Sequence, residues 1–560
     1  MTGPVKRVMT RQLCLVSQAQ PGCVCEHRRY MRLPKIIQGG MGAGVSNWRL
    51  AQAVCKAGQL GVVSSTALDQ IVVRRLGDGD SDGAMRRGFD LFPFPEMAQR
   101  VWREYFVPGG KTPDAPYKST PMHTRNDARK LVELCIVSNF VEVALARLEH
   151  TNPVGINLLE KVQTVHLPSL YGAMLAGVGY VLMGAGIPLH IPGVLDLLAL
   201  HQAAEYKLTV AGAGAEMDTQ MRFDPREFME RELPALTRPK FLAIVSSNTL
   251  AATMLRRANG KVDGFIVEKS TAGGHNAPPR GKMQLSPAGE PIYGERDEVN
   301  LANLRELGVP FWLAGGYHSP EKLREALEAG AAGVQAGTIF EFAEESGLRA
   351  DLKQALLNSI VSLNAKVFTD PLASPTGFPF KVARLAGTLS EAEVYEARAR
   401  VCDLGFLREA YLTESGSMGY RCAAESTAAY VAKGGALEET IGRKCLCNAL
   451  LADVGFPQVR GDGGVELPLV TVGDAINDVA LLVTLGDTRY SAADAIAYVL
   501  GTNRPDGAVP GVYGPPIPSD MFMEDTSQGH GNLRDVEALA NPDLAVHGRT
   551  GAGIHHRQRR

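Results

Sequence analysis

The sequence lacks any apolar run long enough to cross a membrane. A membrane-spanning helix needs ~18 or more consecutive apolar residues, and no run in the 560-residue chain reaches that length. The basic N-terminus, MTGPVKRVMTRQLCLVSQAQ, also lacks the long apolar segment of a secretory signal. We therefore expect that the protein has no membrane partner.

Cysteine, net charge and aromatic residues are also scarce. Nine cysteines, an odd number, do not describe a disulfide scaffold, so the expected location is a reducing cytoplasm. The formal net charge of −2 gives no reason to expect a nucleic acid as partner. Only 6% of the residues are aromatic, whereas 60 residues are glycine and 45% of the chain is hydrophobic. This composition fits a large α/β protein with many tight turns.

Eight short apolar runs, mostly alternating with helical segments, predict the fold class. Each run suits a buried parallel strand, and several end in glycine-rich turns. The alternation predicts a (β/α)8 TIM barrel, in which ligands bind at the carboxyl ends of the strands. The expected strands lie in 35–42, 60–65, 154–158, 179–183, 241–246, 264–267, 311–314 and 332–335.

The chain divides into four parts around this barrel. Residues 1–30 are expected to be a disordered extension, and 31–347 form the barrel. An insertion at about 77–129, rich in Asp, Gly and Pro, precedes the third strand and is expected to cover part of the barrel mouth. Residues 348–513 are expected to be a mostly helical region that contains cysteines, and the polar tail 514–560 is expected to be disordered.

One histidine follows the sixth expected strand directly. The run 264–267 leads into Gly273, Gly274 and His275, and a Pro-Pro pair comes next. The glycines allow the backbone to approach a ligand closely. An imidazole with an ordinary pKa of about 6.5 can exchange a proton near neutral pH. His275 is therefore the candidate catalytic residue, and the alternative is a histidine on a surface loop.

The turns after the last two expected strands form a candidate phosphate site. The sequence AGGYHSPEKL places Gly315 and Gly316 after the seventh strand, and QAGTIF places Gly337 and Thr338 after the eighth. In β/α barrels these two loops commonly bind phosphate through backbone N–H groups. The alternative is that both are merely tight turns. We see no second motif for an adenylate.

Several of these motifs together resemble the nitronate monooxygenase family, whose frame is shared by flavin-dependent enoyl reductases. The resemblance rests on IIQGGMGAGVSNWRLA, VGINLL, TAGGH, FWLAGGYHSPEKLREALEAGAAGVQAGT and FAEESG. It implies that FMN lies on the barrel mouth, with its phosphate on the last two loops and His275 beside the reacting centre. The implied cofactor-binding residues are Gln38, Gly39, Gly40, Met41, Asn157, Gly273, Gly274, Gly315, Gly316, Gln335, Gly337 and Thr338.

The resemblance implies oxidation of alkyl nitronates or nitroalkanes by O2, with a carbonyl compound and nitrite as products. His275 would bind the anionic nitro group when protonated, or act as a base on a neutral nitroalkane. Two alternatives stay open: a flavin-dependent enoyl-thioester reductase, and a flavin-binding partner protein in a multienzyme pathway. A barrel dehydrogenase of the inosine-phosphate type is disfavoured, because the loop 269–280 contains no cysteine nucleophile. A homodimer is one expected assembly.

The chain departs from shorter family members in three places. These are the insertion before strand three, the sequence HNAPPRG after Gly274, and roughly 150 residues of further structure after the barrel. The last part contains Cys402, Cys422, Cys445 and Cys447. Their spacing is not a standard ligand pattern, so buried free cysteines are favoured over a zinc or iron–sulfur site.

Overall fold

The structure is a computed structural model that describes residues 33–214, 216–483 and 488–502. All of them belong to the first of two compact units, 1–506, whereas the second unit is 507–560. The expected disordered segments, 1–30 and 514–560, lie outside the described residues. None of the helices in the described ranges is long and apolar enough to cross a membrane.

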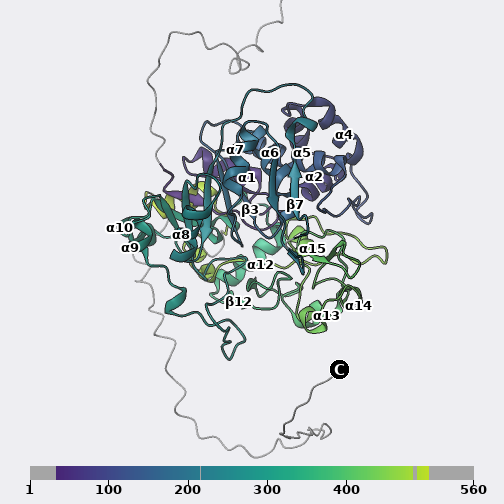
Figure 1. Ribbon diagram of the computed structural model, residues 1–560. Helices are drawn as coiled ribbons and strands as arrows, with labels where there is room; N and C mark the ends of the chain where they lie inside the picture. The colour runs from purple at the N-terminus through teal and green to yellow at the C-terminus, as the bar shows by residue number, and fades with distance from the viewer. Residues whose placement is uncertain (1–32, 215, 484–487, 503–560) are drawn as a thin grey trace, which may run out of the picture. The chain divides into compact units, whose positions relative to one another are not determined.

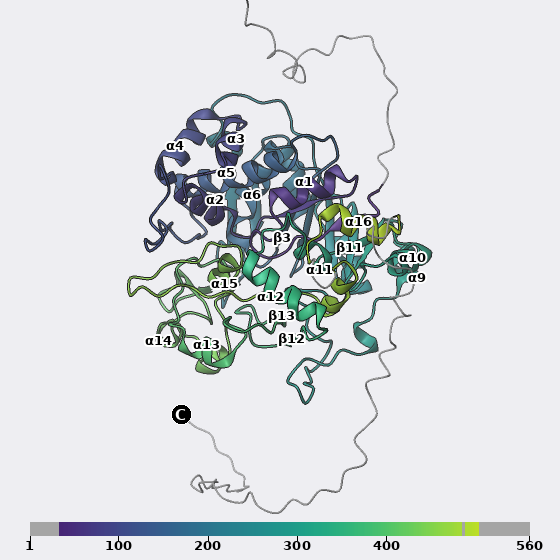
Figure 2. The same cartoon turned by 180° about the vertical axis from the view of Figure 1, so that it is seen from behind.

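Eight parallel strands form one sheet in the order β1-β11-β10-β9-β8-β4-β3-β2 (Figures 1 and 2). A parallel bridge between Ile37 and Leu60 joins the first strand to the segment that enters β2, so the sheet closes. The predicted TIM barrel is confirmed. The strands are β1 Ile36–Gln38, β2 Val62–Ser64, β3 Gly155–Leu159, β4 Tyr180–Gly184, β8 Lys240–Val245, β9 Gly264–Glu268, β10 Phe311–Ala314 and β11 Gly333–Ala336.

Helices follow most of these strands. Asn47 caps the first helix by accepting a hydrogen bond from the Leu50 backbone N–H, and Ser319 caps α10 in the same way through Lys322. The helices of the barrel region are α1 Trp48–Lys56, α2 Leu68–Gly77, α5 Arg129–Ala146, α6 His166–Leu175, α7 Ile191–Ala199, α8 Asn248–Arg257, α9 Leu301–Arg305, α10 Pro320–Glu328 and α11 Thr338–Glu341.

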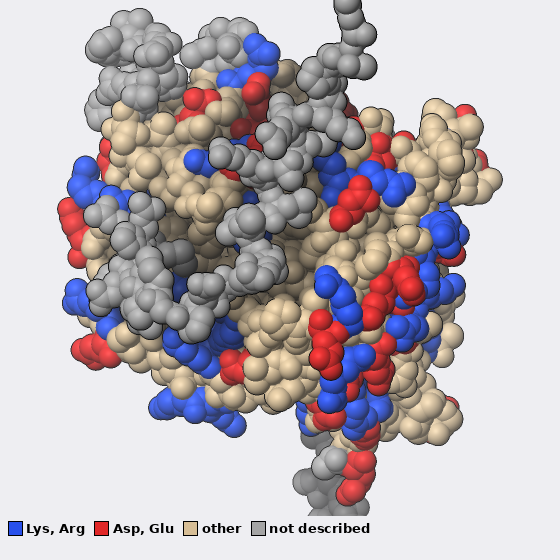
Figure 3. Space-filling model, turned by 90° about the horizontal axis from the view of Figure 1, so that it is seen from above, with Lys and Arg blue, Asp and Glu red and all other residues tan. Residues whose placement is uncertain are grey.

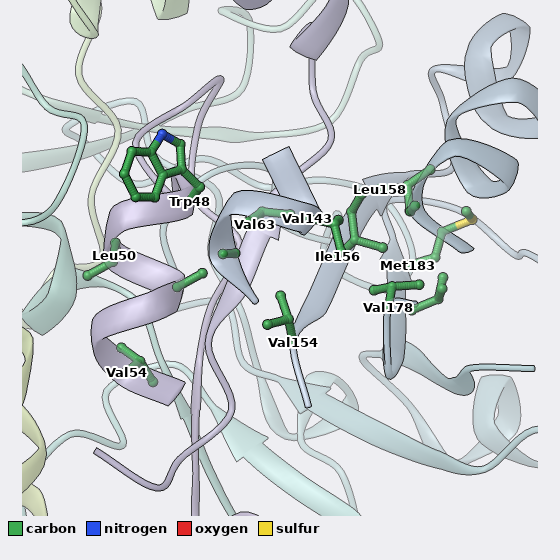
Figure 4. Close-up of a cluster of buried hydrophobic side chains, with 14 of the residues drawn as sticks. Trp48, Leu50, Val54, Val63, Val143, Val154, Ile156, Leu158, Val178 and Met183 are labelled. Carbon is green, nitrogen blue, oxygen red and sulfur yellow. The ribbon is translucent and has the colours of Figure 1, made fainter. Parts of the chain in front are cut away.

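Alternating side chains of each strand fill two separate cores. Val62, Leu182 and Trp312 point into the barrel, where the Trp312 indole N–H donates to the Pro34 carbonyl at 2.8 Å. Neighbouring positions, such as Val63 and Ile156, instead pack against the helices (Figure 4). The two faces follow from the period of two along a strand.

The insertion has helices that pack against other helices of the barrel region. Its two helices, α3 Ala84–Asp90 and α4 Pro95–Tyr105, pack against α5, and α4 also packs against α2 (Figures 1 and 2). The apolar face of α4, including Met97 and Val101, is buried in this contact, which explains the placement. A second insertion, between β4 and β8, carries β5 Ala204–Lys207, β6 Val210–Ala211 and β7 Gln220–Phe223.

The region after the barrel contains hairpins as well as helices, so it differs in detail from the mostly helical expectation. β12 Val367–Asp370 pairs with β13 Phe380–Ala383 across the proline-rich loop 371–379, and the β-branched and aromatic residues of the two strands favour this pairing. β14 Glu409–Leu412 pairs with β15 Met418–Arg421 and with β6. The helices are α12 Ala350–Val361, α13 Ala392–Ala397, α14 Thr427–Ala432, α15 Leu446–Asp453 and α16 Ala492–Leu500.

Five short 3-10 helices complete the described elements: η1 Gln163–Val165, η2 Pro225–Glu227, η3 Glu295–Asp297, η4 Leu437–Thr440 and η5 Asp474–Leu481. Charged side chains of both signs lie interspersed on the face shown in Figure 3. This mixture agrees with the small net charge of the sequence.

Candidate active site

Three adjoining cavities lie at the carboxyl ends of the barrel strands, and Glu268 lines all three. The first, of about 130 Å³, is lined by the turns after β1, β10 and β11. The second, of about 120 Å³, is lined by Asn157, Gly274 and His275. The third, of about 300 Å³, runs outward from His275 between the ends of β8, β9 and β10. We call them the phosphate cavity, the ring cavity and the outer cavity.

Twelve of the thirteen residues that the sequence predicted for the site line these cavities. Asn157 and His275 line the ring cavity. The remaining ten line the phosphate cavity: Gly39, Gly40, Met41, Gly273, Gly274, Gly315, Gly316, Gln335, Gly337 and Thr338. The structure therefore brings together residues that lie about 300 positions apart in the chain.

Gln38 is the exception. It is fully buried, and its side-chain oxygen accepts a hydrogen bond from the Val62 backbone N–H at 3.0 Å. Its amide nitrogen donates to Ser46 Oγ at 2.8 Å. Gln38 does not line any of the three cavities. Its side chain links β1 to β2, a structural role that differs from the predicted contact with a cofactor.

The phosphate and ring cavities have the features that a flavin needs. Gly316 and Gly274 adopt φ of +75° and +79°, and a Cβ at either position would project into open space. The buried Gln335 Oε1 and Thr271 Oγ1 have no hydrogen-bond partner among the described residues, so both are available to a ligand. Gly40 lies so close to Asn157 that a Cβ would come within 2.3 Å of the Asn157 Cβ. The residues present fit a planar group with a phosphate.

At the phosphate cavity, backbone N–H groups supply the partial positive charge. None of the described residues that line it is lysine or arginine. Glu341 also lines it, but burial raises the pKa of this carboxyl well above its usual range, and nearby Asp453 raises it further. The raised pKa disfavours the charged form of Glu341. A phosphate would be held by N–H groups at Gly315, Gly316 and Thr338.

His275 lies at the junction of the ring and outer cavities. Its Nε2 forms a hydrogen bond with Ser374 Oγ at 2.7 Å, and its ring packs edge-on against Phe380 with centroids 4.9 Å apart. Burial lowers the pKa of His275 to about 4. The imidazole is therefore neutral at pH 7, whereas a histidine with an ordinary pKa of about 6.5 is partly protonated at that pH. Both contacting residues come from the region after the barrel.

The region after the barrel forms one wall of the site. The Gly274 N–H donates to Thr471 Oγ1 at 2.8 Å, and the Gly473 N–H donates to Thr338 Oγ1 at 3.1 Å. A Cβ on Gly273 would lie 2.9 Å from the Val472 carbonyl carbon, so only glycine permits this close approach. Residues 471–475 therefore close the phosphate cavity from the outside.

Sequence reasoning missed Glu268, Ser374 and Thr471. Glu268 is the last residue of β9, and its carboxyl faces the cavities while protein encloses it on the remaining sides. Burial raises the pKa of this carboxyl to about 8. A charged residue at the end of a buried strand, in GFIVE, was the signal that could have indicated it. No comparable local signal indicates Ser374 or Thr471.

We expect Thr471→Val to lower the free energy of unfolding by about 1–3 kcal/mol, because the Gly274 N–H would lose its acceptor inside the protein. Urea denaturation of the purified protein measures this change. Thr253→Val is the matched control, since Thr253 Oγ1 bonds only to Thr249 on the surface helix α8. Equal losses in the two variants would show that the bond to Thr471 does not hold the wall in place.

Residues 224–371 match the model of the nitronate monooxygenase family. This range spans β8 to β11 and carries His275 together with both phosphate loops. The resemblance to nitronate monooxygenases is confirmed. This match supports the assignment of the protein as an oxidoreductase. No curated protein sequence matches the chain.

Solved structures with similar folds include FabK from Thermotoga maritima, at 17% identity and a TM-score of 0.40 over 84% of this chain and 92% of that one. A nitroalkane oxidase from Streptomyces ansochromogenes matches at 15% identity and a TM-score of 0.39, over 84% and 96% of the two chains. The enoyl reductase domain of MlnA from Bacillus amyloliquefaciens matches at 12% identity and a TM-score of 0.43, over 84% of this chain and 94% of that one. Sequence identities and TM-scores this low do not support any inference about function.

Proposed function

We propose that the protein is an FMN-dependent reductase of 2,3-enoyl thioesters that takes its electrons from NAD(P)H. The observation that carries this proposal is a neutral histidine at the inner end of an apolar cavity. His275 lines both the ring cavity and the outer cavity, and its low pKa of about 4 leaves it without charge at pH 7. A neutral imidazole suits a thioester carbonyl better than an anion.

The outer cavity supports a substrate with an apolar chain. Its volume is about 300 Å³, and Ile187, Leu250 and Phe378 are among the apolar residues that line it. Lys269 and Arg280 also line it, together with Asp297 and Glu298, so charged groups of both signs stand beside the apolar walls. Burial of a longer chain here would gain about 0.8 kcal/mol for each CH₂ group.

A bound flavin would supply the hydride-transfer chemistry, and the chain would orient the substrate and supply the proton. Gly315, Gly316, Gly337 and Thr338 would hold the phosphate, and Gln335 and Asn157 would lie beside the ring. Glu268 has a pKa of about 8 and therefore holds a proton at neutral pH. We assign to Glu268 the delivery of that proton to the substrate carbon next to the thioester carbonyl, and to His275 the hydrogen bond to the carbonyl oxygen.

Nitronate oxidation is the second candidate, and the family match favours it. In that reaction a neutral His275 would remove a proton from a neutral nitroalkane, and the low pKa of His275 makes it a weak base for this step. The alternative in which a protonated His275 binds an anionic nitronate is disfavoured for the same reason. O2 would be a co-substrate only in this second reaction.

The test compares the two reactions in one preparation. We expect enoyl thioesters to accelerate NAD(P)H oxidation, with kcat/KM rising as the acyl chain lengthens, and FMN to be released from the denatured protein. Nitroalkanes and nitronates should give little O2 uptake. Rapid O2 uptake with nitronate and no response to any enoyl thioester would overturn the proposal in favour of the second candidate. Release of FAD would contradict the cofactor assignment.

A further inference from the structure

A short segment of the later region, 471–475, closes the phosphate cavity from the outside, and we call it the strap. Four of its residues line that cavity: Thr471, Val472, Gly473 and Ala475. The strap is fixed at both ends. Before it, the Val470 carbonyl accepts a hydrogen bond from the Ala383 N–H at 2.9 Å, and after it Ile476 is buried in the core. The part that can open is therefore short, and its own contacts decide how firmly it stays closed.

Three hydrogen bonds fasten the strap to the loops of the barrel. Besides the bonds of Thr471 and Gly473 described above, the Asp474 N–H donates to the Thr271 carbonyl at 3.0 Å. A Cβ on Gly473 would lie 3.0 Å from the same carbonyl oxygen, so the strap lies directly on the loop after β9. All three bonds join neutral groups, and neutral hydrogen bonds are individually weak.

Asp474 of the strap also forms an ion pair with Lys381 of β13. The Lys381 Nζ lies 2.7 Å from Asp474 Oδ1, and it donates to Thr369 Oγ1 at 2.6 Å. The Lys381 side chain is 3% exposed, whereas the Asp474 side chain is 44% exposed. A buried ammonium carries a large desolvation cost, which a carboxylate partner offsets. The burial of Lys381 therefore favours the closed strap.

The main chain of Lys381 contacts the loop that carries His275. The Lys381 N–H donates to the Gly274 carbonyl at 3.0 Å, and the neighbouring Phe380 packs against the His275 ring. These contacts do not involve the Lys381 side chain. A substitution of that side chain therefore removes the contact to the strap and leaves the main-chain bond to the loop in place.

A second carboxylate lies beside the ion pair. Glu290 Oε1 accepts a hydrogen bond from the Thr369 N–H at 2.7 Å, and the charge of Glu290 acts against that of Asp474. The Lys381 ammonium offsets this repulsion. Without Lys381 the closed strap loses an attraction and keeps a repulsion, while opening exposes Asp474 to water. Loss of the ammonium should therefore favour the open strap.

We propose that Lys381 is a positioning residue whose ion pair with Asp474 holds the strap closed and so limits the entry and exit of FMN. The phosphate of the flavin would bind at the turns of Gly315, Gly316 and Thr338, which line the cavity that the strap closes. Local opening of the strap is then needed before the cofactor enters or leaves. The inference rests on the FMN of the proposed function, but on neither of the two candidate reactions.

The test measures FMN exchange in the full-length protein without any substrate. Release is followed after the FMN-loaded protein is mixed with an excess of an FMN-capturing apoprotein such as apoflavodoxin. Uptake is followed by the quenching of FMN fluorescence on mixing with the flavin-free protein. We expect Lys381→Met and Asp474→Asn each to raise both rate constants roughly tenfold, because a truncated charge pair acts mainly on rates. The Kd for FMN should change less than either rate constant, since opening serves entry and exit alike.

The double variant and a matched control sharpen the test. Lys381→Met combined with Asp474→Asn should exchange FMN no faster than the faster single variant, because both substitutions break one contact. Lys433→Met is the control: Lys433 pairs with Glu425 at 2.7 Å in the same region, and neither residue lines the three cavities. Its rates of release and uptake should equal those of the wild type.

Three results would overturn the inference, and they differ in what else they affect. Wild-type exchange rates in both single variants would overturn it and leave the cofactor assignment intact. Faster release with an unchanged rate of uptake would also overturn it, because the strap would then bind FMN without limiting access. Failure of the wild type to take up FMN would overturn it together with the cofactor assignment. Exchange requires no turnover, so a failure to reduce enoyl thioesters is a separate result.

Discussion

Replacing His275 with alanine should lower turnover by ~10²–10⁴-fold while the flavin content stays unchanged. The side chain of His275 lines the ring and outer cavities, whereas the phosphate loops follow β10 and β11. Loss of the imidazole therefore removes a group beside the substrate without removing a contact to the phosphate. Steady-state kinetics and the flavin-to-protein absorbance ratio measure the two effects separately.

Ser374→Ala is the matched comparison for His275→Ala. It removes the hydrogen bond at His275 Nε2 but leaves the imidazole in place against Phe380. Its defect should be smaller than that of His275→Ala, because Ser374 positions the ring and does not face the reacting atoms. A histidine variant with full flavin content and wild-type rates on enoyl thioester, nitroalkane and nitronate would remove His275 from the mechanism.

Glu268→Gln should lower turnover about 10²-fold or more and should abolish one limb of the pH profile. The carboxyl is protonated below its pKa of about 8 and ionised above it. If the protonated form delivers the proton, the wild-type rate falls as pH rises through about 8, by about tenfold for each further pH unit. Glutamine cannot donate that proton, so the variant should be slow and nearly independent of pH in this range.

Glu298→Gln is the control for Glu268→Gln, since it makes the same chemical change at the rim of the outer cavity. Glu298 pairs with Lys269 at 3.4 Å and its side chain is 66% exposed. Its rate and pH profile should remain close to those of the wild type. An unchanged alkaline limb in Glu268→Gln would show that another group carries the proton.

The barrel and most of its mouth could be predicted from the sequence, because both depend on local patterns. A strand such as β9 is a short apolar run, and the turn that contains Gly273 and Gly274 follows it directly. The carboxyl ends of all the strands meet at one face, so local turns predict a shared site. The family resemblance supplied Asn157 and Gln335, which the structure places at the cavities.

The wall of the site could not be predicted, because it depends on contacts between distant segments. Gly274 and Thr471 are separated by 197 positions, and His275 and Ser374 by 99. No periodic pattern indicates which loop of the later region would fold onto the barrel. The low pKa of His275 depends on the same contacts, because Phe380 and Ser374 exclude water from it. The hydrogen bond from Val62 to Gln38 is also a tertiary contact, so the sequence could not indicate that the Gln38 amide links two strands.

If the site reduces an enoyl thioester, the reduced flavin should pass its electrons to that thioester in an anaerobic half-reaction. The purified protein is reduced with one equivalent of NAD(P)H without oxygen and then mixed with a medium-chain 2-enoyl thioester, while flavin absorbance is followed. We expect rapid return of the oxidised flavin spectrum and formation of the saturated thioester. A flavin that stays reduced with every enoyl thioester, together with bleaching of the oxidised protein by a nitronate, would rule out the reductase.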